Sequence, residues 1–192
     1  MNLNPIFSSF FVHEMLNIDN ERIKSFCYKQ KETDLGVSIS NVGGWHSNIL
    51  NINHPELEPL STIVCDRFEQ VNKHIDFGNE IEPNGCWINI NNRGNYNKRH
   101  DHKGNFLSAV YYVNAAPDMG EIVFHNPYHV LEWFQNTDKV NTFNQFNSST
   151  WNMPCRTGLL LIFPAWLEHE VSSNPTDHDR ISIAFNMKRI SE

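Results

Sequence analysis

The second half of the chain consists of short segments rich in β-branched and aromatic residues, and this pattern limits the fold more than any other feature. These segments follow a turn at Pro83-Asn84-Gly85, and clusters of Gly, Pro, Asn and Asp separate them. Short apolar runs bounded by such residues predict β-strands. The predicted strands are Cys86–Ile90, Leu107–Val113, Glu121–His125, Leu159–Pro164 and Ile181–Met187.

The first third of the chain predicts two helices instead. One covers Asp19–Lys31, where cap-type residues precede apolar residues at helical spacing. The other covers His54–His74, with Pro55 near its first turn. Its predicted buried face is Leu60, Ile63, Val64, Phe68 and Val71.

Helices followed by five or more strands favour an antiparallel α+β domain, mainly β, with the helices packed on one sheet. A turn is expected at Gly43-Gly44. No internal repeat or linker divides the sequence, so a single domain over residues 1–192 is predicted, with helical support in 1–80 and the β core in 81–192.

Composition and net charge limit the classes of partner that the protein is expected to bind. The net charge of −7 disfavours nucleic acid, although Lys98, Arg99 and Lys103 could form a local basic patch. No apolar run is long enough to span a bilayer, and the N-terminal residues do not resemble a secretory signal. The four cysteines are scattered, as is typical of reduced thiols in a cytoplasmic protein. The oligomeric state, including a homo-oligomer, is left open.

Three of the ten histidines form a pattern that can bind a metal. His100 and His102 flank Asp101, and residues two apart on an extended segment point to the same side. His169, predicted at the end of the strand that starts near Gly158, could complete a triangle of imidazoles. Imidazole suits iron, zinc, copper and nickel. The same residues, taken alone, also fit surface histidines on a loop.

A cationic side chain follows this pattern. Between His169 and Arg180, residues 172–179 are rich in turn formers, which predicts a hairpin that brings His169 near Ser182. Arg180, Ser182, Ala184 and Asn186 then share one face. A guanidinium group and a hydroxyl behind a metal suit a metal-chelating dicarboxylate such as 2-oxoglutarate. The alternative for Arg180 is a surface salt bridge with Asp177 or Asp179.

In five stretches the chain resembles the 2-oxoglutarate–Fe(II) dependent oxygenases of the prolyl-4-hydroxylase-like group, in a branch found in marine bacteria and phages. The stretches are Ser40-Asn41-Val42-Gly43-Gly44-Trp45, Trp87-Ile88-Asn89-Ile90-Asn91, His100-x-His102 with Leu107–Val113, Phe163–Val171, and Arg180-Ile181-Ser182. The resemblance implies a double-stranded β-helix (jelly-roll, cupin-like) core. It also implies Fe(II) as cofactor, 2-oxoglutarate and O2 as cosubstrates, and hydroxylation of a small-molecule or peptide substrate.

The resemblance assigns roles to single residues. His100 and His169 match the two histidine ligands, and Arg180 with Ser182 matches the pair that holds the far carboxylate of 2-oxoglutarate. His102 stands where the wider superfamily carries Asp or Glu, so a three-histidine site is expected. Asp101 could supply the carboxylate only through a bulged backbone. Asn89 and Tyr112 are expected to line the pocket and to contact the cosubstrate.

Two other functions remain open at this point. Three histidines could hold a catalytic zinc ion, with Glu168 or Glu170 as proton acceptor, in a hydrolase or lyase. The domain could also be a non-catalytic metal-binding jelly-roll module. The segment Tyr128–Pro154 is long for a connection and is a candidate lid, or else a surface excursion.

Overall fold

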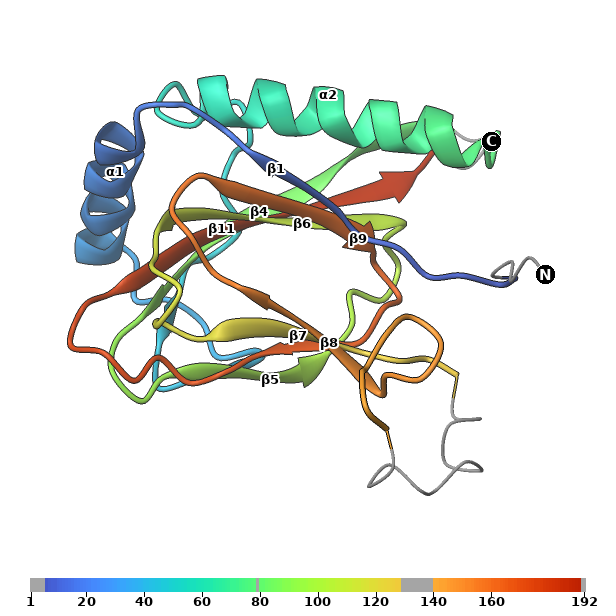
Figure 1. Ribbon diagram of the computed structural model, residues 1–192. Coiled ribbons are helices and arrows are strands. Elements are labelled where there is room, and N and C mark those ends of the chain that lie inside the picture. Colours follow the sequence, from blue (N-terminus) through green and yellow to red (C-terminus); the bar gives the residue numbers. More distant parts are fainter. Residues whose placement is uncertain (1–5, 79, 129–139, 191–192) are drawn as a thin grey trace.

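The computed structural model describes residues 6–78, 80–128 and 140–190, and these residues form two antiparallel sheets that face each other (Figure 1). The larger sheet has the strand order β1 (Val12–Met15), β9 (Leu159–Pro164), β6 (Leu107–Asn114), β11 (Arg180–Arg189), β4 (Ile81–Asn91) and β3 (Trp45–His46). The smaller sheet has the order β2 (Asn41–Val42), β5 (Tyr96–His100), β10 (His169–Val171), β7 (Glu121–His125) and β8 (Thr150–Pro154).

From β4 onward the chain passes back and forth between the two sheets. Strands β4, β6, β9 and β11 belong to the larger sheet, whereas β5, β7, β8 and β10 belong to the smaller one. This winding is that of a jelly roll, and it confirms the predicted double-stranded β-helix. All five predicted strands are present, and β7 and β9 have the predicted bounds.

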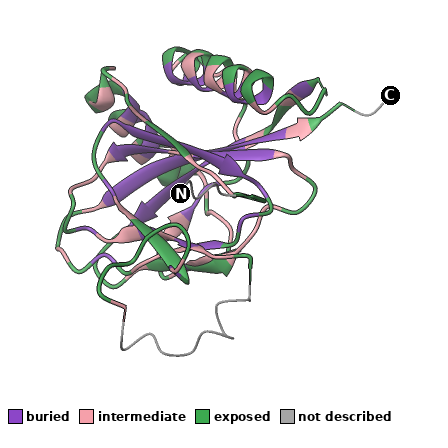
Figure 2. Cartoon of the chain, turned by 45° about the vertical axis from the view of Figure 1, so that its right-hand side comes forward, coloured by how far each residue is buried: buried purple, intermediate pink, exposed green. Residues whose placement is uncertain are grey.

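Two helices cover the outer face of the larger sheet, α1 (Asn20–Thr33) and α2 (Glu58–Ile75) (Figures 1 and 2). In α1 the side chain of Asp19 accepts a hydrogen bond from the backbone N–H of Arg22, as the predicted cap requires. The prediction for α2 was wrong at its start, because the chain turns at His54–Leu57 and the helix begins only at Glu58. Pro59, rather than Pro55, occupies its first turn.

Successive side chains on a strand point to opposite faces of its sheet, and this alternation produces two separate apolar cores. On β4 and β11, Ile88, Ile90, Ile183 and Phe185 point outward and pack against helical residues that include Phe68. Of the predicted helix face, only Ile63 is not fully buried. A second cluster fills one end of the space between the sheets. Its members are Tyr112, Met119, Ile122, Phe124, Cys155, Leu159, Leu161, Phe163 and Leu167.

The predicted hairpin between His169 and Arg180 does not form. Strand β10 pairs with β5 and β7 in the smaller sheet, whereas β11 pairs with β4 and β6 in the larger sheet. His169 also does not end the strand that follows Gly158, because that strand ends at Pro164 and His169 begins β10. Residues 172–179 therefore cross between the sheets, and turn formers suit a crossing as well as a hairpin.

Short or polar strands were missed by the sequence pattern. Strands β1, β2, β3, β5, β8 and β10 have two to five residues each, and none contains an apolar run like the Ile122–Phe124 run of β7. Strand β8 lies within the segment Tyr128–Pro154, for which the sequence predicted a lid or a surface excursion and no strand. Part of that candidate lid, residues 129–139, lies outside the described residues, so its closing role stays a prediction.

Other predictions concern turns and cysteines. Gly43-Gly44 forms the expected turn and carries the chain from β2 in the smaller sheet to β3 in the larger one. The four cysteines are unpaired. Among the residues that the structure describes, no helix is both long and apolar enough to cross a membrane.

Candidate metal and dicarboxylate site

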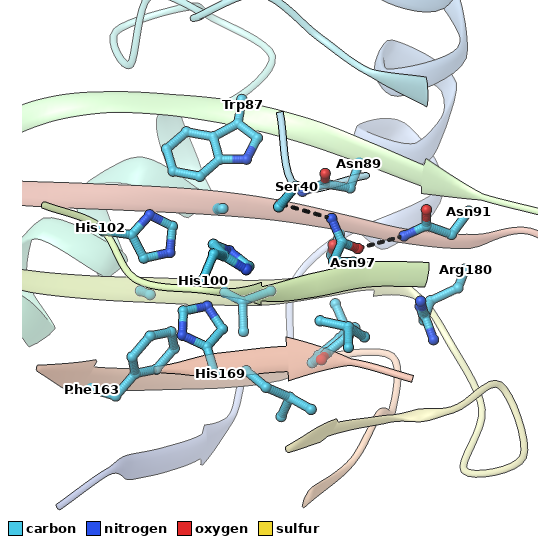
Figure 3. Close-up of a pocket in the computed structure, with 17 residues that line it drawn as sticks. Ser40, Trp87, Asn89, Asn91, Asn97, His100, His102, Phe163, His169 and Arg180 are labelled. Atoms are coloured by element: carbon cyan, nitrogen blue, oxygen red, sulfur yellow. Dashed lines mark hydrogen bonds between the residues drawn. The ribbon is translucent and has the colours of Figure 1, made fainter. Parts of the chain in front are cut away.

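Three imidazoles meet between the two sheets (Figure 3). His100 ends β5 and is the register partner of His169, which begins β10. The ring centroids of these two residues are 4.4 Å apart, and that of His102 lies 5.2 Å from His100 and 5.1 Å from His169. One potential ligand atom from each ring lies within 4.8 Å of the others. His100, His102 and His169 therefore lie together, as the sequence predicted.

Backbone carbonyls determine which ring nitrogen of two histidines faces the cluster. Nδ1 of His100 lies 2.6 Å from the carbonyl oxygen of Lys98, and Nδ1 of His169 lies 2.9 Å from that of Leu167. A carbonyl oxygen only accepts hydrogen bonds, so Nδ1 carries the proton in both rings. The lone pair then resides on Nε2, the atom that can bind a metal.

Burial keeps the three imidazoles uncharged. Desolvation lowers the pKa of His100, lowers that of His102 to about 3, and lowers that of His169 well below its ordinary value. Mutual repulsion between the protonated forms lowers the pKa of His102 and His169 further. Neutral imidazole is the form that ligates metals, so the cluster is ready to bind at neutral pH.

Aromatic side chains hold two of these rings in place. The ring of Phe163 meets that of His169 edge to face at 4.7 Å between centroids. Trp87 lies 5.6 Å from His102 on one side and stacks on His46 at 5.6 Å on the other. No role for His46, Trp87 or Phe163 was predicted. The alternation of Trp87 with Asn89 and Asn91 on one strand was the signal available in the sequence.

Arg180 is almost completely buried, with 1% of its surface exposed. Its Nη1 donates hydrogen bonds to the carbonyl oxygens of Met119 and Ser172. The alternative of a surface salt bridge is wrong: Asp177 pairs with Arg93, and Asp179 accepts a hydrogen bond from the Tyr28 hydroxyl. In the described part of the chain, no carboxylate forms an ion pair with the guanidinium group.

The other predicted contacts of the cosubstrate form a row across three adjacent strands. Ser182 on β11 is the register partner of Asn89 on β4 and of Tyr112 on β6. All three side chains line the same cavity as Arg180. Within the described chain, Nη2 of Arg180, the hydroxyl of Tyr112 and Oδ1 of Asn89 are buried without a hydrogen-bond partner. Such atoms are costly unless a ligand or water satisfies them.

One cavity joins the histidines and Arg180. The view in Figure 3 shows the histidines toward one side of this cavity and Arg180 at the other. Between them, Asn97 donates to Ser40 and accepts from Asn91, both at 3.3 Å. Sequence reasoning gave no role to these three residues.

Three acidic residues considered from the sequence lie elsewhere. Asp101 is not a member of the cluster of potential metal ligands. Glu168 forms an ion pair with Arg99, and Oε2 of Glu170 lies 3.8 Å from Nε2 of His125. None of the three is among the described residues that line the cavity. The described residues of the cavity walls therefore supply imidazoles, amides, hydroxyls and one guanidinium group, but no carboxylate.

Three solved structures with similar folds are distant from this chain in sequence. A prolyl-4-hydroxylase from Pseudomonas putida shares 15% identity, with a TM-score of 0.66 over 96% of this chain and 95% of that chain. HygX from Streptomyces hygroscopicus, solved with nickel and 2-oxoglutarate bound, shares 12%, with a TM-score of 0.63 over 94% and 83%. The viral collagen prolyl hydroxylase vCPH from Paramecium Bursaria Chlorella virus-1 shares 9%, with a TM-score of 0.62 over 94% and 96%. These likenesses concern the fold.

Comparison of the sequence itself identifies the family. No curated protein matches the chain. A family model described as "Putative 2OG-Fe(II) oxygenase" matches residues 85–186, which is more than half of the 192 residues. That range contains the three histidines, Arg180 and every other predicted site residue. The chain therefore belongs to this family of 2-oxoglutarate- and Fe(II)-dependent oxygenases.

Proposed function

We propose that the protein is a 2-oxoglutarate- and Fe(II)-dependent hydroxylase in which His100, His102 and His169 hold the metal. The observation that carries the proposal is the placement in one cavity of three neutral imidazoles and of a buried guanidinium group whose Nη2 has no hydrogen-bond partner in the described chain. Imidazole nitrogens suit Fe(II), and three of them leave other coordination positions open. When bound, iron with 2-oxoglutarate supplies the oxidising chemistry of the family.

Arg180 and its neighbours fit the far carboxylate of 2-oxoglutarate. The free Nη2 of Arg180 and the free hydroxyl of Tyr112 are both hydrogen-bond donors, and a carboxylate offers acceptors to each. Because none of the described residues that line the cavity is acidic, the charge of Arg180 is available to an incoming anion. Ser182 and Asn89 lie in the same row and add polar contacts.

The remaining residues of the cavity orient the reactants and limit water. Phe163 and Trp87 fix two of the imidazoles, while Nδ1–H bonds to carbonyls fix the tautomers of His100 and His169. Asn91 and Asn97 present amide groups beside the cosubstrate site and could contact a small-molecule or peptide substrate. Structures with related folds include an epimerase and a carbocyclase, so the fold alone does not imply hydroxylation. Hydroxylation is therefore the part of the proposal that goes beyond the family.

The test is an anaerobic titration of the Fe(II)-loaded protein with 2-oxoglutarate, followed by visible absorption. A weak charge-transfer band that needs both components is expected, because 2-oxoglutarate chelates the metal. Arg180→Ala should raise the dissociation constant for 2-oxoglutarate roughly tenfold or more, since a charge-assisted contact is lost. Incubation with O2 should then convert 2-oxoglutarate to succinate.

A different result would move the function to hydrolytic chemistry. Absence of the band, with one tightly held zinc ion and no effect of Arg180→Ala, would overturn the proposal. The positions of Glu168 and Glu170 argue against that outcome, because neither of these potential proton acceptors is among the described residues lining the cavity. Failure to bind either metal or 2-oxoglutarate would indicate a non-catalytic module.

A further inference from the structure

Gly120 occupies a position in which a side chain would collide with Arg180. A Cβ atom added to Gly120 would lie 2.5 Å from Nη1 of Arg180 and 2.9 Å from the carbonyl oxygen of Ser172. Its φ is +97°, a conformation that L-residues with side chains rarely adopt. Gly120 immediately precedes β7, in the sequence Met119-Gly120-Glu121. Space and backbone conformation thus both require glycine here.

The residues on either side of this contact orient the guanidinium group. Nη1 of Arg180 donates to the carbonyl of Met119, directly before Gly120, and to the carbonyl of Ser172 at 2.9 Å. Ser172 is in turn fixed to Glu121, because its hydroxyl accepts from the N–H of Glu121 at 2.8 Å and its own N–H donates to the Glu121 carbonyl. Three successive residues, 119–121, therefore build one wall of a cradle around Nη1.

This cradle leaves the positive charge of Arg180 directed into the cavity. Carbonyl oxygens orient the guanidinium group without neutralising it, whereas a carboxylate partner would cancel its charge. Nη1 is engaged by two carbonyls, whereas Nη2 is buried without a hydrogen-bond partner in the described chain. A guanidinium group binds a carboxylate well only when its planar fork is correctly aimed.

We infer that Gly120 is a positioning residue for the cosubstrate: its missing side chain leaves the space in which Arg180 is held by the carbonyls of Met119 and Ser172. The inference rests on the proposed function and extends it from the residue that contacts 2-oxoglutarate to the residue that aims it. A methyl group at position 120 would push Nη1 from its two carbonyls and redirect Nη2.

The test compares Gly120→Ala with Gly94→Ala. Gly94 has a similar positive φ of +82°, but a Cβ there would meet no atom within 4 Å, so this control measures the cost of backbone conformation alone. Gly120→Ala should raise the dissociation constant for 2-oxoglutarate, read from the charge-transfer band, by roughly tenfold to a hundredfold. Gly94→Ala should leave it within about twofold, and Fe(II) affinity should be unchanged in both variants.

A double-mutant cycle with Arg180→Ala separates positioning from general destabilisation. In the Arg180→Ala background, Gly120→Ala should change the dissociation constant less than about threefold, since the residue it displaces is gone. If the single variant does not fold but the double variant does, the steric conflict with Arg180 is established directly. If neither folds, the conflict is with the backbone of Ser172 and the inference fails.

Two negative results have different meanings. A wild-type protein without the charge-transfer band would overturn the proposed function. A wild-type protein that shows the band, with Gly120→Ala and Gly94→Ala affecting 2-oxoglutarate equally, would overturn only the role of Gly120.

Discussion

The resemblance to 2-oxoglutarate–Fe(II) oxygenases sets His102 where a carboxylate ligand is expected. Its imidazole lies 5.1–5.2 Å from the other two histidine rings by centroids, whereas Asp101 does not belong to the cluster. If His102 is the third ligand, as we propose, a bound Fe(II) ion is one unit more positive than it would be with a carboxylate ligand. Among the described residues that line the cavity, none is acidic and none would compensate.

This residue-scale difference gives a direct prediction about the metal ligand. His102→Ala should weaken Fe(II) binding roughly tenfold or more, because one of three ligands is removed, whereas His102→Asp should retain binding. Asp101→Asn is the matched control and should leave Fe(II) affinity unchanged. Anaerobic titration with Fe(II) measures all three variants, and a loss with Asp101→Asn equal to that of His102→Ala would assign the ligand to Asp101.

At the scale of elements, strands from both sheets bring distant residues together. The smaller sheet places His100 beside His169 at the ends of β5 and β10, and the larger sheet aligns Asn89, Ser182 and Tyr112. Strand β10 has only three residues, so its orientation depends on packing with neighbouring elements. The ring of Phe163 on β9 provides part of that packing against His169.

Two buried phenylalanines on different elements should therefore behave differently when shortened. Phe163→Leu and Phe68→Leu should each lower the free energy of unfolding by roughly 1–3 kcal/mol, because both rings are buried. Only Phe163→Leu should also weaken Fe(II) binding, by roughly tenfold, since Phe68 is part of α2 and lies in the outer core, away from the histidines. Chemical denaturation and metal titration test this, and equal metal affinities would contradict a role for Phe163 in orienting His169.

For the whole molecule, burying ionisable histidines couples stability to pH. Their folded pKa values are lowered, to about 3 for His102, whereas unfolded imidazoles titrate near 6.5. Below pH 6.5 the unfolded chain binds protons that the folded chain does not, so stability present above this pH is lost as the pH falls. Glu14, Asp34 and other carboxylates with lowered pKa values affect stability only at more acidic pH.

The metal-free protein should accordingly lose stability between pH 7 and pH 5. His102→Gln should remove about 1.4 kcal/mol of this loss for each pH unit below 6.5, since one buried titrating group is absent. Denaturant unfolding at several pH values measures both slopes. An unchanged free energy of unfolding over this range in the wild-type protein would show that the imidazoles are not desolvated in the folded state.

Local signals in the sequence determined much of this protein. Apolar runs of five or more residues between turn formers placed the major strands, and helical spacing with Asp19 placed α1. The spacing of His100, His102 and His169, with Arg180 and Ser182 after them, predicted the candidate site, and the family followed from the resemblance of five stretches of the chain. These features can be predicted from the sequence because the spacing of apolar residues reports a strand or a helix, and because each side chain carries its own metal-binding or hydrogen-bonding atoms.

Tertiary structure alone decided how these parts meet. It placed β10 and β11 in opposite sheets, so His169 and Ser182 share a cavity by facing each other across it and not by pairing. It also surrounded Arg180 with the carbonyls of Met119 and Ser172 and made Gly120 necessary. Such contacts depend on long-range pairing and backbone direction. No local sequence pattern predicts these contacts, because every residue has the same backbone carbonyl group and the sequence does not show which carbonyl will face Arg180.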